Sequence, residues 1–556
     1  MDIFILVANS DGIRFEGVRN CFKTTEPIYF KPFRAFEYQQ TPQAVNHEYQ
    51  TYIQICADRK KIIINTSPFG EYPLFFFQNR SQLFISSSLE RVCQKAVEAE
   101  DGPLIDRVAI LESMIFDYPL RQRTILANVS KAMPGKCYSF DLINGVYKLE
   151  NHFIIPFDKG EPGADEACLL DQATEVLSSL PLNNLTNNDG DVLLPLSGGL
   201  DSRLLACLLK RDGVNFNAIT FGPPESTERI IAQKVAKNLN IPLRILNLAT
   251  EYYRTYGSKV TALTGGLANH RHCHLFSILT ANGIKSDNII HGYLGGEYAG
   301  AAQPDFATSY KMSKNEALDQ FLNQHVRSHR IWSMISQMDS DEIISDLEKI
   351  MHECCKVNLP CHFDEYVHNV ERQFSLISNI FIISEHFGHF IRPFASQKYA
   401  VFFNSLPFKY RRGRYLFRKA ALNLFPRSFT IGTQSQIFPE NSLNGKFEML
   451  LSRMFSGLSF ASFLLTKGQL VIPNPKGYEH HRQALFGNLK TAFLNGIGEM
   501  NKLLGVDLTP FQQISFKNKD ELSSQYRILS NSIEIKCLRN KTQSTQNNIH
   551  SDSSFL

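Results

Sequence analysis

The segment SGGLDS (residues 197–202) combines two hydroxyl groups, two glycines and a carboxylate within six residues, and it follows an apolar run that ends at Leu196. Gly198 and Gly199 carry no side chain, so an anion can approach the backbone closely. The two serines add hydroxyl donors. The helical pattern that follows would present free N–H groups and a positive dipole end to the same anion. Together these features favour a phosphate group as the ligand.

Asp201 is out of place beside an anion unless a cation is also present. A carboxylate next to phosphates is a common ligand of Mg²⁺, so the segment indicates a site for a magnesium nucleotide. The chain contains no G-x-x-x-x-G-K-[ST] sequence, which excludes the usual P-loop. The alternative is a strand-to-helix turn that is glycine-rich for structural reasons alone.

The elements around this segment predict how it is held. From about residue 190, strand-like and helical patterns alternate, which predicts a parallel sheet with helices on both faces. Ligands of such sheets bind beyond the carboxyl ends of the strands, where SGGLDS lies. The predicted strands are 192–196, 217–221, 243–248 and 288–291, and the predicted helices are 202–210 and 227–238.

The rest of the chain differs in pattern, so we expect two domains, one α+β and one α/β. Residues 1–155 hold short strand-like runs such as KKIIINTS and PLFFFQ, which predict a mostly antiparallel domain. Turn-forming residues mark 156–189 as a linker. Residues 190–430 would form the second domain and 431–537 a C-terminal extension. The polar stretch 538–556 is expected to be a disordered tail.

Composition argues against several classes of protein. The net charge of +4 over 556 residues, with scattered phenylalanines, gives no indication of nucleic-acid binding. No run of about 18 uncharged apolar residues and no signal peptide are apparent, so no membrane partner is expected. The eleven cysteines form no compact framework, and reduced thiols in a cytoplasmic protein are the expectation.

SGGLDS resembles the pyrophosphate motif of the N-type ATP pyrophosphatases, and the chain is similar to the asparagine synthetase family, which includes β-lactam synthetase and the lasso-peptide cyclases. Further segments carry the resemblance in the family's order: INTSPFGEYPLFFF, RTILANVSKAMPGKCYSF, HGYLGGEYAG, IRPF and FKYRRGRYLFRKA. The resemblance implies an N-terminal Ntn-hydrolase-like antiparallel sandwich and a parallel-sheet ATP pyrophosphatase domain with a helical extension. It also implies an ATP- and Mg²⁺-dependent reaction in which a carboxylate is adenylated, pyrophosphate is released, and a nitrogen nucleophile displaces AMP to form an amide.

The same resemblance implies a set of site residues. Asp201 and Glu297 would hold Mg²⁺, although Glu297 stands one position beyond Gly296, where the family often has its second acidic ligand. His270, His274 and Arg418 would line the substrate pocket. The nucleotide would contact Leu196, Ser197, Gly198, Gly199, Leu200, Asp201, Ser202, Thr220, Phe221, Gly222, Gly292 and Gly295.

Position 2 departs from the family. Asp2 stands where glutamine-dependent members carry the cysteine that hydrolyses glutamine, and the first cysteine of this chain is Cys21. A carboxylate does not replace that thiolate nucleophile. We therefore expect residues 1–155 to be a degenerate amidotransferase-like domain without glutaminase activity. Such a domain could serve only to pack against its neighbour.

Three residues are candidates for catalysis. Arg414 stands at the family's catalytic lysine; its charge would stabilise the acyl-adenylate transition state, but it cannot give up a proton at working pH. Tyr293 lies where β-lactam synthetase has a catalytic tyrosine and could help deprotonate an amine, or it could merely line the pocket. Glu385 lies one helical turn before His389, which stands where asparagine synthetase has a glutamate.

Two functions stay open after these observations. The intact SGGLDS favours an amide-forming ligase, acting on a small-molecule or peptide carboxylate with an amine donor that the sequence does not identify. The changes at Gly296, Ser396 and Arg414 favour a catalytically impaired protein that serves as a scaffold or binds a partner. A homodimer or a partner enzyme is compatible with either function.

Overall fold

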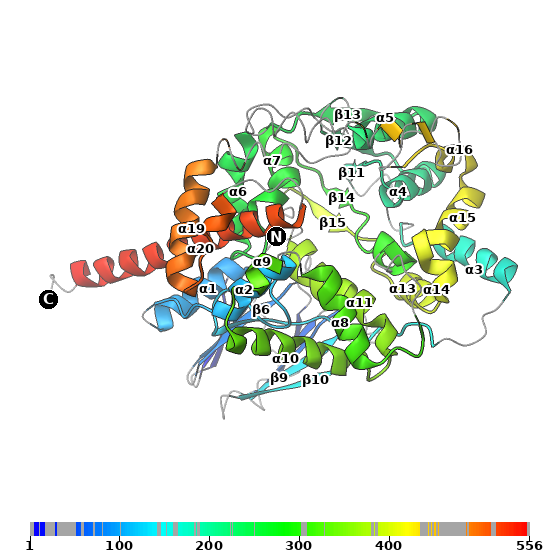
Figure 1. The fold of residues 1–556 in the computed structure, drawn as a ribbon. Helices are drawn as coiled ribbons and strands as arrows, with labels where there is room; N and C mark the ends of the chain where they lie inside the picture. Colours follow the sequence, from blue (N-terminus) through cyan, green and yellow to red (C-terminus); the bar gives the residue numbers. More distant parts are fainter. Residues whose placement is uncertain are drawn as a thin grey trace.

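The protein is described from a computed structural model (Figure 1). The structure describes residues 5–552 except 10–11, 17–27, 31–51, 57–60, 71–72, 80–81, 101, 142–145, 152, 160–164, 183–184, 186–189, 223, 225, 250, 302–308, 327–328, 380–382, 384–386, 434–442, 444–445, 448–449, 452–453, 455–484, 486, 488 and 513–518. Among these residues, no helix combines the length and apolar character needed to cross a bilayer.

Two antiparallel sheets form the N-terminal part of the protein, as its strand-like runs predict. They pack face to face, because Phe76 of one sheet contacts Tyr138 and Phe140 of the other, at ring-centroid distances of 5.5 and 5.2 Å. One sheet has the order β2-β1-β7-β6-β8, with bounds Gly12–Glu16, Ile5–Asn9, Gln82–Ser86, Phe75–Gln78 and Val129–Lys131. The other has the order β10-β9-β5-β4-β3, with bounds Val146–Asn151, Lys136–Asp141, Lys61–Asn65, Tyr52–Cys56 and Ile28–Phe30.

A five-stranded parallel sheet follows, in the order β13-β12-β11-β14-β15. The chain starts it at the central strand β11, builds outward to β12 and β13, and then crosses back to β14 on the other side of β11. The reversal of direction between β11 and β14 is the kind of switch point at which parallel sheets bind ligands. The strands span Leu243–Leu246 (β13), Asn217–Phe221 (β12), Val192–Pro195 (β11), Asn288–Ile290 (β14) and His389–Ile391 (β15).

Helices flank this sheet, and Figure 1 shows α4 and α7 on opposite sides of its strands. Local sequence explains their ends: Ser226 caps α5 by accepting from the backbone N–H of Arg229, and Asn240 ends it in the left-handed conformation. The helices of this part are α4 (Leu200–Arg211), α5 (Thr227–Leu239), α6 (Glu251–Leu263) and α7 (His274–Ala281). The predicted helices at 202–210 and 227–238 are therefore confirmed.

The remaining helices fill the space between the sheets and extend beyond them. They are α1 (Leu89–Ala99), α2 (Arg107–Phe116), α3 (Glu166–Ser178), α8 (Lys314–His325), α9 (His329–Trp332), α10 (Gln337–Cys354), α11 (Phe363–Tyr366), α13 (Gln397–Asn404), α14 (Phe408–Arg411), α15 (Tyr415–Leu424), α16 (Pro426–Phe429), α19 (Lys490–Leu504) and α20 (Lys519–Asp552), with short 3₁₀ or π segments η2 (His270–Cys273), η3 (Glu297–Ala301), η4 (Pro360–His362), η5 (Val367–Ile377), η6 (Arg412–Arg414) and η7 (Thr509–Gln512).

Helix α20 corrects one expectation, because the predicted disordered tail at 538–556 is helical up to Asp552. Its first half is anchored by fully buried side chains such as Tyr526 and Leu529, and an established helix extends at little further cost. The same helix packs with α19 against α1, α2 and α6. One hydrophobic core thus joins elements from the N-terminal part, the parallel-sheet part and the C-terminal extension.

Candidate functional site at the switch point of the parallel sheet

The loop after β11 is held in shape by its own serines. The Ser202 hydroxyl accepts the backbone N–H of Ser197 at 3.1 Å and lies 3.1 Å from the Ser197 hydroxyl, which in turn accepts the N–H of Gly199 at 3.1 Å. Gly199 is the N-cap of α4 and supplies no side-chain cap. The first N–H groups of a helix have no partner within it, so this end of α4 is suited to an anion.

A second glycine-rich loop, after β14, packs directly on the first. A β-carbon at Gly292 would lie 2.9 Å from the Asp201 Cβ, and one at Gly295 would lie 2.7 Å from the Asp201 Oδ1 and 2.9 Å from the ring of Phe394. Only glycine allows the two loops to approach this closely. The structure therefore brings together Asp201, Gly292 and Gly295, three residues that the sequence places in the nucleotide site.

The carboxylate of Asp201 is paired with Arg414. The Arg414 Nη1 donates to the Asp201 Oδ2 at 3.3 Å, and Nη2 bonds the Oδ1. Arg414 adopts a left-handed backbone conformation (φ 60°) directly after Gly413 (φ 58°). A non-glycine residue in this region is strained. The left-handed turn at Gly413 and Arg414 thus places the Arg414 guanidinium on Asp201, the proposed metal ligand.

Glu297, at the start of η3, belongs to the same charge group. Its Oε1 accepts the Gln373 Nε2 at 2.9 Å. Burial, and next the negative charge of Asp201, raise the pKa of the Glu297 carboxyl, whereas the guanidinium groups of Arg372 and Arg414 lower it. The carboxylates of Asp201 and Glu297 therefore share one group of charges with the guanidinium groups of Arg414 and Arg372.

Mg²⁺ fits the oxygen donors of this group, since it binds through one or two carboxylates together with phosphate oxygens and water. Asp201 and Glu297 would hold it. Both Asp201 oxygens accept bonds from Arg414, so Arg414 has to release them first. Within the described part of the chain, no group of three or more His, Cys, Asp or Glu side chains is arranged to hold a metal, and the remaining ligands would come from phosphate and water.

The carboxyl end of β12 lies at the same edge of the sheet as the loop after β11, because the two strands pair in parallel. Thr220, Phe221 and Gly222, which the sequence assigns to the nucleotide, lie at this strand end. Gly222 has a positive φ of 117°, and its carbonyl accepts the Arg229 Nη1 at 3.1 Å. The ring of His274 lies 5.7 Å from that of Phe221. His274 is thus near the strand end that the sequence assigns to the nucleotide.

His270 is placed differently, and its predicted role as a pocket residue is wrong. Its side chain is fully buried, with hydroxyl groups at 3.2 Å (Ser258), 3.1 Å (Thr261) and 3.0 Å (Ser530) from its ring nitrogens. The ring packs against Gly257 of α6, where a β-carbon would collide with it. Burial lowers the pKa of His270 to about 3, so it is a neutral core residue between α6 and α20.

The other predicted residues are more scattered. The Tyr293 hydroxyl donates to the backbone carbonyl of Phe69 at 3.0 Å, which ties the β14 loop to the N-terminal part of the protein and argues against a proton-transfer role. Arg418 is exposed on α15. Glu385 and Asp2 lie outside the described residues.

Arg203, the residue directly after SGGLDS, carries no role in the sequence-based account but is prominent in the structure. Its side chain is fully buried, and its guanidinium bonds the carbonyl of Gly198 in the loop at 3.2 Å. The only signal in the sequence is its position one turn into the helix that the motif begins. Its burial could not be predicted from that position, because arginine is seldom buried and the carbonyls that it bonds at Ser428 and Gly432 lie far away in the chain.

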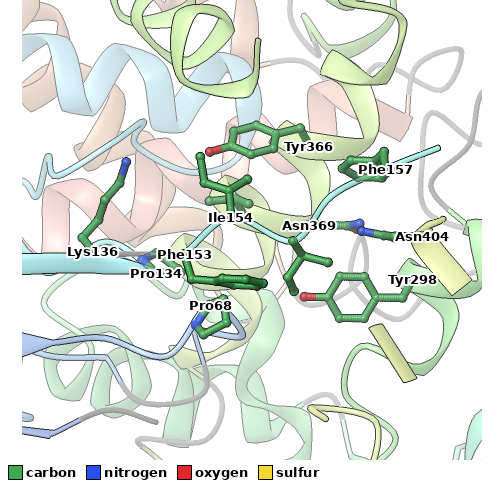
Figure 2. Close-up of a pocket in the computed structure, with 12 residues that line it drawn as sticks. Pro68, Pro134, Lys136, Phe153, Ile154, Phe157, Tyr298, Tyr366, Asn369 and Asn404 are labelled. Carbon is green, nitrogen blue, oxygen red and sulfur yellow. The ribbon is translucent and has the colours of Figure 1, made fainter. Parts of the chain in front are cut away.

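A small cavity lies away from this loop, where the antiparallel part meets η3 and η5 (Figure 2). It measures about 20 Å³, which is room for a water molecule. The side-chain amide of Asn369 and the Oδ1 of Asn404 line it without a hydrogen-bond partner among the described residues. Since no residue of SGGLDS lines this cavity, it is not part of the nucleotide site.

Comparison with known proteins finds relatives of the segment that contains the loop after β11. Residues 182–262 match the asparagine synthase family. Over 138 residues the chain is 30% identical to a 7-cyano-7-deazaguanine synthase from Methanospirillum hungatei, covering 21% of this chain and 62% of that relative. A solved NMN synthetase from Francisella tularensis, at 15% identity, aligns with 40% of this chain and 96% of its own, but with a TM-score of 0.18, too low to support an argument about the fold. The segment that contains the loop after β11 is thus similar to the asparagine synthase family, the family that its motifs resemble.

Proposed function

We propose that this protein is an ATP-dependent ligase that adenylates a carboxylate, releases pyrophosphate and forms an amide with a nitrogen nucleophile. The observation that carries the proposal is the meeting of two glycine-rich loops around Asp201 at the switch point between β11 and β14. The match to the asparagine synthase family covers the first of these loops. The chain spans 62% of the curated relative that it matches, so that relative's substrate is not carried over.

The groups at the site suit pyrophosphate as the leaving group. The ordered hydroxyls of Ser197 and Ser202 and the N-terminus of α4 are donors held in place before any ligand binds, and fixed donors stabilise charge that develops in a transition state. When bound at Asp201 and Glu297, Mg²⁺ would neutralise charge on the phosphates. Arg414, once released from Asp201, would supply positive charge to the negative charge that forms on the activated carboxyl group.

We also propose that the protein has no glutaminase activity, because Asp2 replaces the nucleophile of the family. The nitrogen donor would then be free ammonia or an amine, including one within the substrate. In this proposal the two antiparallel sheets are an amidotransferase-like domain that supports the synthetase part. The Tyr293 bond to Phe69 is one of the contacts that would couple them.

A second candidate is a scaffold protein that keeps the fold without the reaction. The pairing of both Asp201 oxygens with Arg414 favours it, because this pair gives the carboxylate a partner without any metal.

Pyrophosphate release with Mg-ATP and a panel of small and peptide carboxylates separates the two candidates, with ATP binding measured in parallel by calorimetry. The ligase proposal predicts ATP binding in wild type and at least one active carboxylate. Asp201→Ala should abolish turnover, and Asp212→Ala, an exposed change at the end of the same helix, should not. Absence of ATP binding in wild type would establish the scaffold instead.

A further inference from the structure

The strongest unassigned feature of the site is the buried guanidinium of Arg203. It lies behind the loop after β11 and is fully buried. All four of its hydrogen bonds go to backbone carbonyls: Gly198 at 3.2 Å, Ser428 at 3.3 Å, Ile431 at 3.1 Å and Gly432 at 2.6 Å. One side chain thereby joins the loop to the segment that follows α16.

The charge of Arg203 has no opposite charge near it. Among the described residues, no carboxylate forms an ion pair with it, and the positive charge of Arg418 lowers the pKa of Arg203 further. Burial raises the pKa of the neighbouring Cys207 thiol to about 11, so that thiol stays neutral. Burial also lowers the pKa of Arg203, to about 10, so the guanidinium is still cationic at neutral pH.

A buried cation without a carboxylate partner is costly to fold. The carbonyl acceptors and the ring of Phe429, whose centroid lies 5.6 Å from the Arg203 guanidinium carbon, offset part of that cost but carry no negative charge. A neutral side chain could donate hydrogen bonds to the same carbonyl groups, and its burial would cost less desolvation free energy. The excess positive charge lies directly behind Gly198, in a loop whose front is lined by hydroxyls and helix N–H groups. An anion in that loop would supply the missing negative charge.

We propose that Arg203 is a positioning residue for polyphosphate binding, which fixes the Gly198 carbonyl to the 428–432 segment and supplies an unpaired positive charge beneath the loop. This inference rests on the proposed function, because it requires that the loop binds the phosphates of ATP. In addition to the groups of the proposed function, Arg203 would act on the phosphates through the loop without touching them.

The experiment compares binding of Mg-ATP, inorganic pyrophosphate and adenosine to the full chain by calorimetry. Adenosine carries no phosphate, so it reports on the shape of the site without the charge. Arg203→Met removes the charge and keeps most of the volume, and Arg203→Lys keeps the charge but can make fewer of the bonds. Arg211→Met, two turns further along α4 on an exposed side chain paired with Asp212, is the matched control.

Arg203→Met should weaken pyrophosphate and ATP binding about 15- to 50-fold, as expected for a unit charge roughly 7 to 10 Å away at an effective dielectric constant of about 20. Adenosine affinity should change less than about twofold, and Arg203→Lys should retain pyrophosphate affinity within about fivefold. The control should match wild type for all three ligands.

Unchanged pyrophosphate affinity in Arg203→Met, or equal losses for adenosine and pyrophosphate, would overturn the inference and leave Arg203 as a structural clamp only. If Arg203→Met does not fold, Arg203→Lys decides: a pyrophosphate loss above about tenfold in a folded protein contradicts the role of charge. Wild type that binds neither ATP nor pyrophosphate would instead contradict the proposed function, and this inference with it.

Discussion

In the structure the Arg414 guanidinium bonds the carboxylate of Asp201, the proposed Mg²⁺ ligand. Replacing Arg414 by methionine should free that carboxylate, so that Mg²⁺ stabilises the protein even without nucleotide. The change removes the guanidinium that bonds both oxygens of Asp201 and leaves the repulsion between Asp201 and Glu297 compensated by Arg372 alone among the cations named above. The unfolding free energy of the protein should fall, and added Mg²⁺ should restore part of it. Wild type should show little response to Mg²⁺ alone.

The size of the loss follows from burial. The side chains of Arg414 and Asp201 are 13% and 24% exposed, so the pair lies between an exposed one, worth about 0–1 kcal/mol, and a fully buried one, whose disruption costs about 3–5 kcal/mol. We expect a loss of about 2–3 kcal/mol. If Mg²⁺ binds the variant with a Kd of about 1 mM, 10 mM Mg²⁺ should return about 1.4 kcal/mol.

The pH dependence gives an independent check. Arg414 lowers the pKa of Glu297, so the variant should hold that pKa further above the unfolded value of about 4.3. A carboxyl group whose pKa is raised by folding destabilises the protein as pH rises above the unfolded value. The variant should therefore lose stability between about pH 5 and 7 more steeply than wild type does.

Urea unfolding at several pH values, with and without Mg²⁺, measures all three effects, and Arg414→Lys is the control that keeps a cation. A variant as stable as wild type, indifferent to Mg²⁺ and unchanged in pH profile would refute the assignment of Arg414 as the cation that compensates these carboxylates.

Three further predictions follow from the contacts around the site. Tyr293→Phe should cost about 1 kcal/mol of unfolding free energy, because one buried hydrogen bond is lost, and should lower turnover less than about threefold; a loss above about 100-fold would restore its role in proton transfer. Gly295→Ala should weaken ATP binding at least about tenfold, because its β-carbon would lie 2.7 Å from a carboxylate oxygen, whereas Gly498→Ala, with nothing within 4 Å, should bind ATP as wild type does. His270, with its pKa lowered to about 3 by burial, should make the folded state less stable as pH falls below about 6.5; His270→Gln should flatten that slope, and an unchanged slope would show that other groups cause it.

The four strands predicted from residue 190 onward overlap β11, β12, β13 and β14, and the loop after β11 lies where the sequence places it. The strands predicted at 192–196 and 217–221 are confirmed as β11 and β12, and most residues of both strands are buried. Strand β15 was not predicted as a strand. Strand β15 is only three residues long (His389–Ile391). Its place in the sheet comes from parallel pairing with β14, a contact between residues far apart in the chain.

Within the site, the sequence indicates where the backbone is approached closely but not which side chains pair across the chain. The glycine type of Gly292 and Gly295 indicates a close approach, and the structure shows that Asp201 is the residue that approaches them. The pairing of Arg414 with Asp201 joins residues 213 positions apart, and a single sequence gives no measure of that contact. His270 lies in a histidine-rich run of the sequence. Its hydrogen-bond partners come from α6 and α20, and packing between these two helices makes it a core residue.

The central claim is that the loop after β11 binds the pyrophosphate portion of ATP. Calorimetric titration of inorganic pyrophosphate with Mg²⁺ into wild type and Asp201→Ala tests it most directly, since it needs neither the carboxylate nor the amine. The account predicts saturable one-to-one binding in wild type and at least about tenfold weaker binding in the variant, because one charged metal ligand is removed. Equal binding by the two proteins, or none by wild type, would contradict it.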